Sequence, residues 1–243
     1  MPGGRSWGLT GAGREAGPVA WRAGQGMDVA VDELRLRHVR WLGGGSGAGK
    51  STIARRLAAR YGLRLYSTDD VMAEHAGRCR PADSPLLQAF VDMTMDERWL
   101  RRSPEEMVET FHWFRGEGFD LIVEDLLRLP VQPGALVEGF RLLPQLVDSG
   151  RAVWLLPTPE FRRAAFAARG TLWHIAGHTS DAPRALGNLL ERDRLFTDRM
   201  REQTRHLRMQ SVEVDTATSV EDLTRRVAGA LDLGDQARPA VAP

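Results

Sequence analysis

The sequence predicts a three-layer α/β domain, in which helices cover both faces of a five-stranded parallel sheet. Five short apolar runs alternate with helical patterns between residues 38 and 231, and such alternation is typical of this fold class. The first run leads directly into a glycine-rich loop, then a helix and a second run. A strand, helix and strand of this length imply a right-handed crossover between parallel strands.

The glycine-rich loop over residues 44–52 reads Gly-Gly-Ser-Gly-Ala-Gly-Lys-Ser-Thr and fits G-x-x-x-x-G-K-[ST] in full. Such glycines let successive backbone N–H groups turn inward around an anion, and the helix that follows adds the positive end of its dipole. The predicted cofactors are therefore ATP and Mg²⁺. The expected nucleotide-binding residues are Gly44, Gly45, Ser46, Gly47, Ala48, Gly49, Lys50, Ser51 and Thr52.

Within this loop, Lys50 is expected to act in catalysis by reaching the β- and γ-phosphates, and the Ser51 hydroxyl is expected to bind the metal. Lys50 is the only lysine among the 33 Lys and Arg residues of the chain. The composition is strongly biased toward arginine, yet the one lysine occupies the position where a phosphate loop needs a compact, flexible charge.

Composition and net charge limit the classes of partner that the protein is expected to bind. The chain of 243 residues carries a net charge of +1, which argues against an extended nucleic-acid surface. The single cysteine, Cys79, allows no intrachain disulfide, and no apolar stretch is long enough to span a bilayer. We therefore expect a cytoplasmic protein that binds small molecules rather than membranes or nucleic acids.

Residues 1–34 lack a periodic apolar face and are expected to be disordered, residues 35–233 to form one domain, and residues 234–243 to form a loose tail. Long helices are predicted over residues 184–207 and after Ser219, whereas residues 72–102 are predicted to be irregular. The expected strands are residues 38–42, 63–66, 151–156 and 209–214, and residues 135–141 are expected to contain a further strand, which Glu138 ends, and the exit from it.

Three helix boundaries carry clear signals. The helix after the phosphate loop is expected to end at Gly62, because glycine readily adopts the left-handed conformation at that position. Ser103-Pro104-Glu105-Glu106 predicts a helix start with a capping box, and that helix is expected to continue to about residue 127, before Pro130. Thr158-Pro159-Glu160 predicts another start.

Two carboxylates follow the second predicted strand, in Ser67-Thr68-Asp69-Asp70. The carboxyl ends of parallel strands share one edge, so Asp69 and Asp70 are expected near the phosphate loop. Asp69 is predicted to be catalytic, accepting or orienting the proton of a substrate hydroxyl. The alternative is that one of the two caps a helix that starts near Val71, and Asp70 is expected to serve as that cap or as a substrate contact.

The phosphate loop, followed about twenty residues later by Ser-Thr-Asp-Asp, resembles the P-loop kinases of nucleotides and small molecules, including the polynucleotide 5′-hydroxyl kinases. Asp69 occupies the position of the base in those enzymes. Glu138-Gly139-Phe140-Arg141 is similar to the Asp-Gly-Phe-Pro-Arg segment of adenylate-type kinases. The resemblance implies that Glu138 holds Mg²⁺ directly or through water, and it implies the strand order 2-3-1-4-5.

The resemblance also assigns regions. It implies an acceptor-binding part over residues 72–128, where Trp113 is a candidate contact, as are Trp99, His112 and Arg115. Arg141 is a further substrate candidate, although it lies one position earlier than the arginine that binds an acceptor phosphate in adenylate-type kinases. A lid is implied over residues 158–208, in which Arg192 and Arg199 share a helix face and are expected to be catalytic.

The function implied is an ATP- and Mg²⁺-dependent phosphotransferase, an enzyme that moves the γ-phosphoryl of ATP to a hydroxyl of a small molecule. One alternative is a nucleoside monophosphate kinase-like enzyme whose acceptor is a phosphate. A second alternative is a non-catalytic nucleotide-binding regulator. A GTPase of the usual kind is excluded, because its Asn-Lys-x-Asp motif needs a lysine outside the phosphate loop.

Overall fold

The computed structural model describes residues 36–147, 149–169 and 171–234. The predicted disordered segment over residues 1–34 lies outside the described residues, as does the predicted tail beyond residue 234.

The core of the fold is a sheet of five parallel strands in the order β2-β3-β1-β4-β5. The strands are β1 (Val39–Gly44), β2 (Arg64–Ser67), β3 (Ala135–Glu138), β4 (Ala152–Pro157) and β5 (Ser211–Val214). Glu138 at the end of β3 is in register with Leu42 of β1 and Ser67 of β2. The fold class and the strand order are therefore confirmed, and the ends of β1, β2 and β3 meet at one edge.

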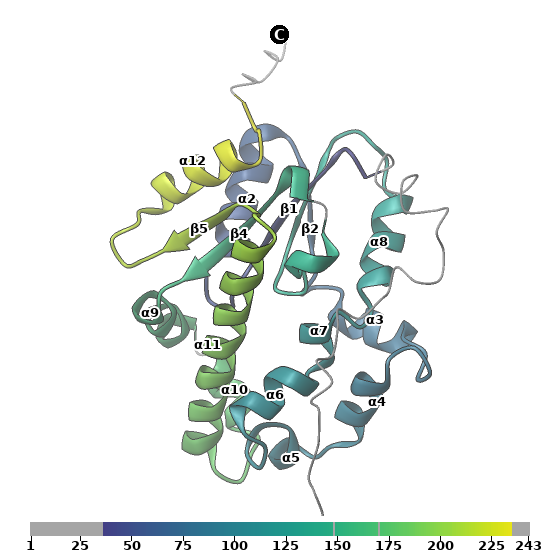
Figure 1. The fold of residues 1–243 in the computed structure, drawn as a ribbon, viewed down its shortest axis with the longest axis vertical. Coiled ribbons are helices and arrows are strands. Elements are labelled where there is room, and N and C mark those ends of the chain that lie inside the picture. Colours follow the sequence, from purple (N-terminus) through teal and green to yellow (C-terminus); the bar gives the residue numbers. More distant parts are fainter. Residues whose placement is uncertain (1–35, 148, 170, 235–243) are drawn as a thin grey trace, which may run out of the picture.

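Helices cover both faces of this sheet (Figure 1). On one face, α2 (Lys50–Tyr61) and α12 (Val220–Ala230) bury an apolar cluster that contains Leu42. On the other, α8 (Phe119–Arg128) and α11 (Ala182–His206) bury a cluster that contains Trp41. Neighbouring residues of β1 point to opposite faces, as the pleat requires, so the two layers of helices have separate cores.

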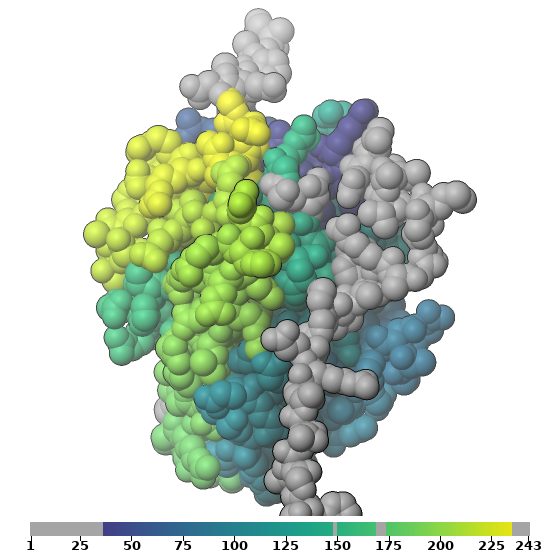
Figure 2. Space-filling model, in the orientation of Figure 1, coloured from purple at the N-terminus to yellow at the C-terminus, as the bar shows by residue number. Residues whose placement is uncertain are grey.

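A helical part lies beyond the carboxyl edge of the sheet, below it in Figure 1. This part contains the third apolar cluster of the fold, which includes Trp99, Met107 and, from α11, Leu189. Figure 2 shows the lower half of α11 in contact with the surface of α5 and α6. The remaining helices are α3 (Met72–Arg78), α4 (Pro85–Asp92), α5 (Met95–Trp99), α6 (Pro104–Thr110), α7 (His112–Arg115), α9 (Pro159–Arg169) and α10 (Thr171–Ala176), with the 3₁₀ turns η2 (Pro144–Leu146) and η3 (Ser149–Arg151).

The prediction of one helix from residue 103 to about 127 is wrong, because α6, α7 and α8 replace it. Phe111 is extended, with φ −75° and ψ 111°. Gly116 and Gly118 are left-handed, with φ 88° and 69°, a conformation that glycine adopts without steric cost. The chain turns at these three residues and brings α7 and α8 against the sheet.

The stretch predicted to be irregular, residues 72–102, contains α3, α4 and α5. These helices are short, so their apolar periodicity spans too few residues to be read from the sequence. The capping box lies here, between Thr94 and Glu97. At the predicted box, the Ser103 side chain accepts from the Glu106 N–H, and no reciprocal bond from the Glu106 side chain is found in the described structure.

Two other predicted helix boundaries agree with the structure to within two residues. Gly62 ends α2 in the left-handed conformation, with φ 64°. The predicted helix over residues 184–207 is α11, which starts two residues earlier because the Asp181 side chain accepts from the Arg184 N–H.

Candidate functional site

The phosphate loop joins β1 to α2 and takes its form from glycines. Gly44, Gly47 and Gly49 have φ values of 134°, 77° and 83°, which side chains other than glycine rarely tolerate. A Cβ at Gly44 would also overlap the backbone of Leu155. The loop therefore wraps closely around the start of α2, as an anion-binding loop must.

Lys50 is the first residue of α2, and its side chain is buried inside the loop. Its Nζ donates to the carbonyl oxygens of Gly44 at 3.2 Å and Gly45 at 2.9 Å. The ammonium is thus held at the centre of the concavity, beside the helix N-terminus that would face a nucleotide's phosphates.

Glu138 ends β3 and is 2% exposed. Its Oε2 has no hydrogen-bond partner within the described structure. Burial raises the pKa of its carboxyl and Asp69 adds to this, whereas Lys50 and hydrogen bonds with Ser51 and Ser67 oppose it. A buried carboxylate with an unsatisfied oxygen, beside the hydroxyl of Ser51, fits the needs of a hard cation such as Mg²⁺.

The described residues contain no group of three His, Cys, Asp or Glu side chains that could hold a metal. Mg²⁺ in nucleotide sites keeps several waters and is completed by phosphate oxygens, so one hydroxyl and one carboxylate are a sufficient protein contribution. Ser51 and Glu138 therefore fit a nucleotide-bound metal and do not form an all-protein metal cage.

Asp69 follows β2 and lies next to the turn after Glu138. The Thr68 hydroxyl donates to its Oδ1 at 3.4 Å. Gly139 has φ 151°, and a Cβ there would overlap the Thr68 hydroxyl and lie 3.3 Å from Asp69 Oδ1. Part of Asp69 reaches solvent, yet its surroundings desolvate the carboxyl enough to raise its pKa, while Lys50 and Thr68 lower it. Asp69, Lys50 and Glu138 thus share one electrostatic site.

Arg162, which lies in the predicted lid but was not among the arginines expected to be catalytic, packs against the loop. A Cβ at Gly47 would lie 3.4 Å from the Arg162 Cγ of α9. Arg162 is 5% exposed and burial lowers its pKa. Its Nη1 makes only long hydrogen bonds, to the Asp193 carbonyl at 3.3 Å and to the Thr197 hydroxyl at 3.4 Å. No carboxylate of the described chain lies within ion-pair distance of Arg162.

Comparison with known families agrees with this geometry. Residues 43–137 match the model of the family described as AAA domain, which is a family of P-loop NTPases often found in small-molecule kinases. The chain has the P-loop NTPase fold. The matched segment runs from the loop through α2 and β2 to β3, so it includes the P-loop, Asp69 and the helices α3 to α8 between β2 and β3.

A comparison with curated proteins found no match. Among solved structures, the chain is similar to an uncharacterized protein from Eubacterium ventriosum ATCC 27560, with 14% sequence identity and a TM-score of 0.43. The alignment covers 80% of this chain and 98% of that chain. In the described part of this chain, every helix is too short or too polar to cross a membrane.

The two lid arginines chosen from the sequence are engaged with protein groups. Arg192 is buried, its Nη2 lies 2.6 Å from Asp193 Oδ1, and its guanidinium packs over the rings of Trp99, Phe111 and Phe114. Arg199 forms an ion pair with Glu109. Arg162 lies against the P-loop at Gly47, beside Phe166, and Thr197 of α11 lies against Gly45. A sequence signal for Arg162 existed, since it lies in the first turn of the helix that follows β4.

Arg141 and Trp113, both predicted substrate contacts, are packed against each other instead of facing open space. Arg141 is 2% exposed and Trp113 5%. The Arg141 guanidinium donates to the Gly118 carbonyl at 2.9 Å and to the Thr68 carbonyl at 3.4 Å, and it contacts His75 Nδ1 at 3.1 Å. Burial lowers its pKa to about 10. Both side chains are therefore part of the wall that supports Asp69.

Two other side chains predicted to contact an acceptor, those of Trp99 and His112, are also buried, whereas Arg115 is partly exposed and lines the cavity described below. Trp99 and His112 pack with Phe90 and Phe111. Burial, with Arg141 and Arg98 nearby, lowers the pKa of His112 to about 3, so its ring is neutral at physiological pH. The aromatic residues of this region build the third core.

Asp70 does not cap α3. The N-cap of that helix is Val71, and no side chain makes a capping hydrogen bond there. The Asp70 side chain is exposed. The capping prediction is wrong, and the alternative prediction of a substrate contact stays a prediction.

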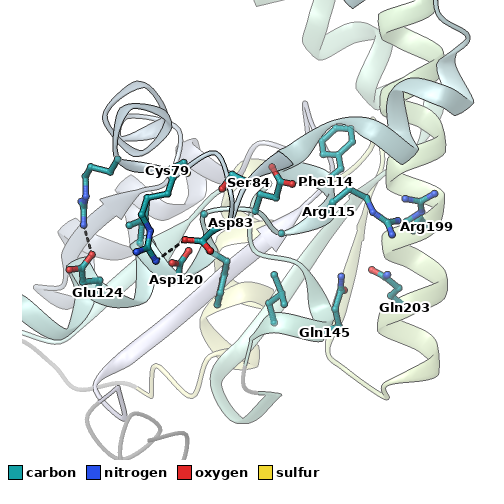
Figure 3. Close-up of a pocket in the computed structure, with 18 of the residues that line it drawn as sticks. Cys79, Asp83, Ser84, Phe114, Arg115, Asp120, Glu124, Gln145, Arg199 and Gln203 are labelled. Atoms are coloured by element: carbon teal, nitrogen blue, oxygen red, sulfur yellow. Dashed lines mark hydrogen bonds and ion pairs between the residues drawn. The ribbon is translucent and has the colours of Figure 1, made fainter. Parts of the chain in front are cut away.

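A cavity of about 1230 Å³ lies on the α8 and α11 face of the sheet (Figure 3). Its walls include Asp120 and Glu124 of α8 on one side and Arg199 and Gln203 of α11 on the other. Lys50, Asp69 and Glu138 are not among its lining residues. Gly118 does line the cavity, and its carbonyl oxygen accepts a hydrogen bond from Arg141. Arg141 therefore contacts the wall of this cavity through the Gly118 carbonyl.

Proposed function

We propose that the chain is an ATP- and Mg²⁺-dependent phosphotransferase that moves the γ-phosphoryl of ATP to a hydroxyl of a small molecule. One observation carries this proposal: β1, β2 and β3 end in register at one edge of the sheet, so the P-loop with Lys50, the Glu138 carboxyl and Asp69 meet there. The Lys50 ammonium offsets part of the rise that burial causes in the pKa of both carboxyls. This edge of the sheet thus combines the phosphate-binding loop, the pair Ser51 and Glu138 for a metal, and the carboxylate of Asp69. These are the parts that phosphoryl transfer needs.

In this proposal, the P-loop backbone and Lys50 bind the β- and γ-phosphates. Ser51 and Glu138 would hold Mg²⁺ directly or through water, and a metal there would supply positive charge to the phosphate oxygens. Arg162 lies against Gly47 without a carboxylate partner among the described residues, so its charge is available to the transferring phosphoryl group. Fixed cations at that point stabilise the charge of the transition state.

Asp69 is proposed to accept the proton of the acceptor hydroxyl. A general base works best when its pKa is close to the working pH, and desolvation shifts the pKa of Asp69 in that direction. Lys50 and the Thr68 hydroxyl oppose this shift, because both favour the carboxylate form. Asp69 can therefore orient the hydroxyl and take its proton as the phosphoryl group departs from ATP.

The position of Arg141 favours a hydroxyl acceptor over a phosphate acceptor. An enzyme of the nucleoside monophosphate kinase kind needs a cation for the acceptor phosphate, and the sequence resemblance suggested Arg141 for this role. In this chain Arg141 is buried on Trp113 and makes three hydrogen-bonding contacts with protein groups. A phosphate acceptor would also give Asp69 no proton to remove.

The test is mass spectrometry of a small-metabolite extract incubated with the full chain, Mg²⁺ and ATP labelled with ¹⁸O in its γ-phosphoryl group. Wild type is expected to label a metabolite, which identifies the acceptor. Asp69→Asn should lower turnover by about 10²- to 10⁴-fold. Asp92→Asn, the same change at an exposed carboxylate at the end of α4, should leave turnover within about twofold.

Two outcomes would contradict the proposal in different ways. A loss of less than about fivefold in Asp69→Asn, with the labelled phosphoryl group joined to a phosphate of the acceptor in a phosphoanhydride, would favour the phosphate acceptor. If wild type binds ATP but labels nothing among nucleotides, sugars, cofactors and antibiotics, a non-catalytic nucleotide-binding regulator becomes the better account.

A further inference from the structure

A buried chain of hydrogen bonds connects Arg141 to Asp125 of α8 through His75 of α3. Arg141 Nη1 lies 3.1 Å from His75 Nδ1, and His75 Nε2 lies 2.8 Å from Asp125 Oδ2. The His75 ring has no exposed surface. Three segments that are far apart in the sequence are joined at this point: the start of the acceptor-side helices, their last helix and the turn after β3.

The direction of each bond follows from the donors. An arginine guanidinium has donors only, so His75 Nδ1 must accept from Arg141. The neutral ring then carries its proton on Nε2 and donates it to Asp125. Tyr66 also donates to Asp125 Oδ2 at 2.8 Å, and Arg78 donates to Oδ1 at 2.9 Å. Burial alone would raise the pKa of Asp125, but these hydrogen bonds lower it to about 2, so it accepts as a carboxylate.

The other end of this chain reaches the backbone beside Asp69. Arg141 Nη1 also donates to the Thr68 carbonyl at 3.4 Å, in the residue that immediately precedes Asp69. Arg141 Nη2 donates to the Gly118 carbonyl at 2.9 Å, and the guanidinium plane stacks on Trp113. Trp113 and Gly118 hold the guanidinium from one side. His75 is the side chain that restrains the edge nearest to Thr68.

We propose that His75 is a positioning residue for phosphoryl transfer, which orients Arg141 and thereby holds the Thr68–Asp69 segment in its working position. This role rests on the function proposed above, in which Asp69 is the base. His75 is fully buried and cannot touch an acceptor or a nucleotide, so it acts only through Arg141. A displacement of the base by about 1 Å can cost about a hundredfold in rate, which makes such support a requirement for turnover.

The kinetic test compares three variants of the full chain with wild type, once an acceptor is known. His75→Leu removes both hydrogen bonds and should lower kcat by about tenfold to a hundredfold, with the KM for ATP within about twofold. His75→Gln offers an acceptor to Arg141 and a donor to Asp125, and should recover kcat to within about threefold of wild type.

Tyr66→Phe is the matched control. It deletes a 2.8 Å hydrogen bond to the same Asp125 oxygen but leaves the branch through His75 to Arg141 intact. Thermal unfolding is measured for all three variants, and kcat is measured well below the lowest Tm. A fall in kcat shared equally by Tyr66→Phe and His75→Leu would overturn the positioning role, because it would report general loosening. So would full kcat in a folded His75→Leu variant.

The hydrogen-bond chain is tested separately by ¹⁵N NMR of the imidazole nitrogens in the full chain, with the His75 signals identified by their loss in His75→Gln. We expect a protonated Nε2 and an unprotonated Nδ1 at pH 7. The opposite tautomer would overturn the inference whatever the activity. If the tautomer is the expected one but wild type transfers no phosphoryl group, the proposed function is wrong and so is the positioning role. The assigned hydrogen bonds from Arg141 through His75 to Asp125 would still be correct.

Discussion

The guanidinium carbon of Arg141 lies 4.0 Å from the centre of the Trp113 ring, and both side chains are buried. The sequence resemblance offered both residues as contacts to a substrate, yet they contact each other. A desolvated cation on an aromatic face is a favourable pair, and here it closes the space behind Asp69. The region predicted to bind an acceptor therefore presents a packed wall at this point.

Arg141→Met should destabilise the protein by about 3 kcal/mol. The substitution removes the contact with Trp113 and leaves the buried acceptors on His75, Thr68 and Gly118 without their donor. Urea unfolding measures the change. Arg225→Met is the control, because that side chain is exposed and should change stability by less than about 0.5 kcal/mol. Unchanged stability with a large rise in the KM for the acceptor would show that Arg141 binds substrate after all.

Gly139→Ala should both destabilise the protein and impair turnover. The new methyl group would overlap the Thr68 hydroxyl at a residue with φ 151°, so Thr68 and Asp69 must move. We expect a loss of more than about 2 kcal/mol in the free energy of unfolding. Gly187→Ala is the matched control: nothing lies near its Cβ position in α11, and it should stabilise the helix by about 0.5–1 kcal/mol. Equal behaviour of the two variants in urea unfolding would refute this account.

Glu138→Gln should stabilise the protein at neutral pH in the absence of metal. Burial raises the folded-state pKa of this carboxyl, so the folded state binds protons more tightly than the unfolded state, and ionisation costs stability as the pH rises above the unfolded pKa. Removing the charge should recover about 1 kcal/mol. The same variant should lose the extra stabilisation that Mg²⁺ adds to ATP binding, measured as a Tm shift.

An exposed carboxylate provides the control for Glu138. Glu202→Gln, on the accessible side of α11, should change the free energy of unfolding by less than about 0.5 kcal/mol and keep the Mg²⁺ effect. A Glu138→Gln protein that is less stable than wild type without metal would contradict the assigned cost of burying this charge.

Arg162→Met should lower kcat by about 10²- to 10³-fold, because a fixed cation beside the transferring phosphoryl group acts mainly on the transition state. Arg163→Met is a closely matched control, since the neighbouring side chain is 72% exposed and pairs only with Glu160 among the described residues. It should leave kcat within about twofold. If Arg199→Met lowers kcat and Arg162→Met does not, the lid arginine predicted from the sequence is the correct one.

Asp125 should contribute to acid sensitivity. Its folded pKa is about 2, below the ordinary value of 3.8, so its contribution is present above the unfolded pKa and is lost as the pH falls from about 4 to about 2. Compared with Asp125→Asn, wild type should be more stable by about 2 kcal/mol at pH 6. The difference should shrink at pH 3 in urea unfolding. A difference that is independent of pH would show that the contacts of Asp125 do not depend on its charge.

The sequence was sufficient for the parts of this molecule that depend on local chemistry. Glycine spacing specifies a phosphate loop, and the alternation of strands and helices specifies a parallel sheet, because period and turn residues act over a few neighbours. Asp69 and Glu138 could be assigned to one edge from the sequence, since each ends a predicted strand and parallel strands end together.

The tertiary structure decided which long side chains reach the P-loop. Phe111, Gly116 and Gly118 break the predicted helix and turn Trp113 toward Arg141, and the packing of α9 against the loop selects Arg162. An arginine can extend in several directions from the same backbone position. Its direction is set by the acceptors, rings and carboxylates that distant segments bring within reach, and a one-dimensional pattern does not contain that information.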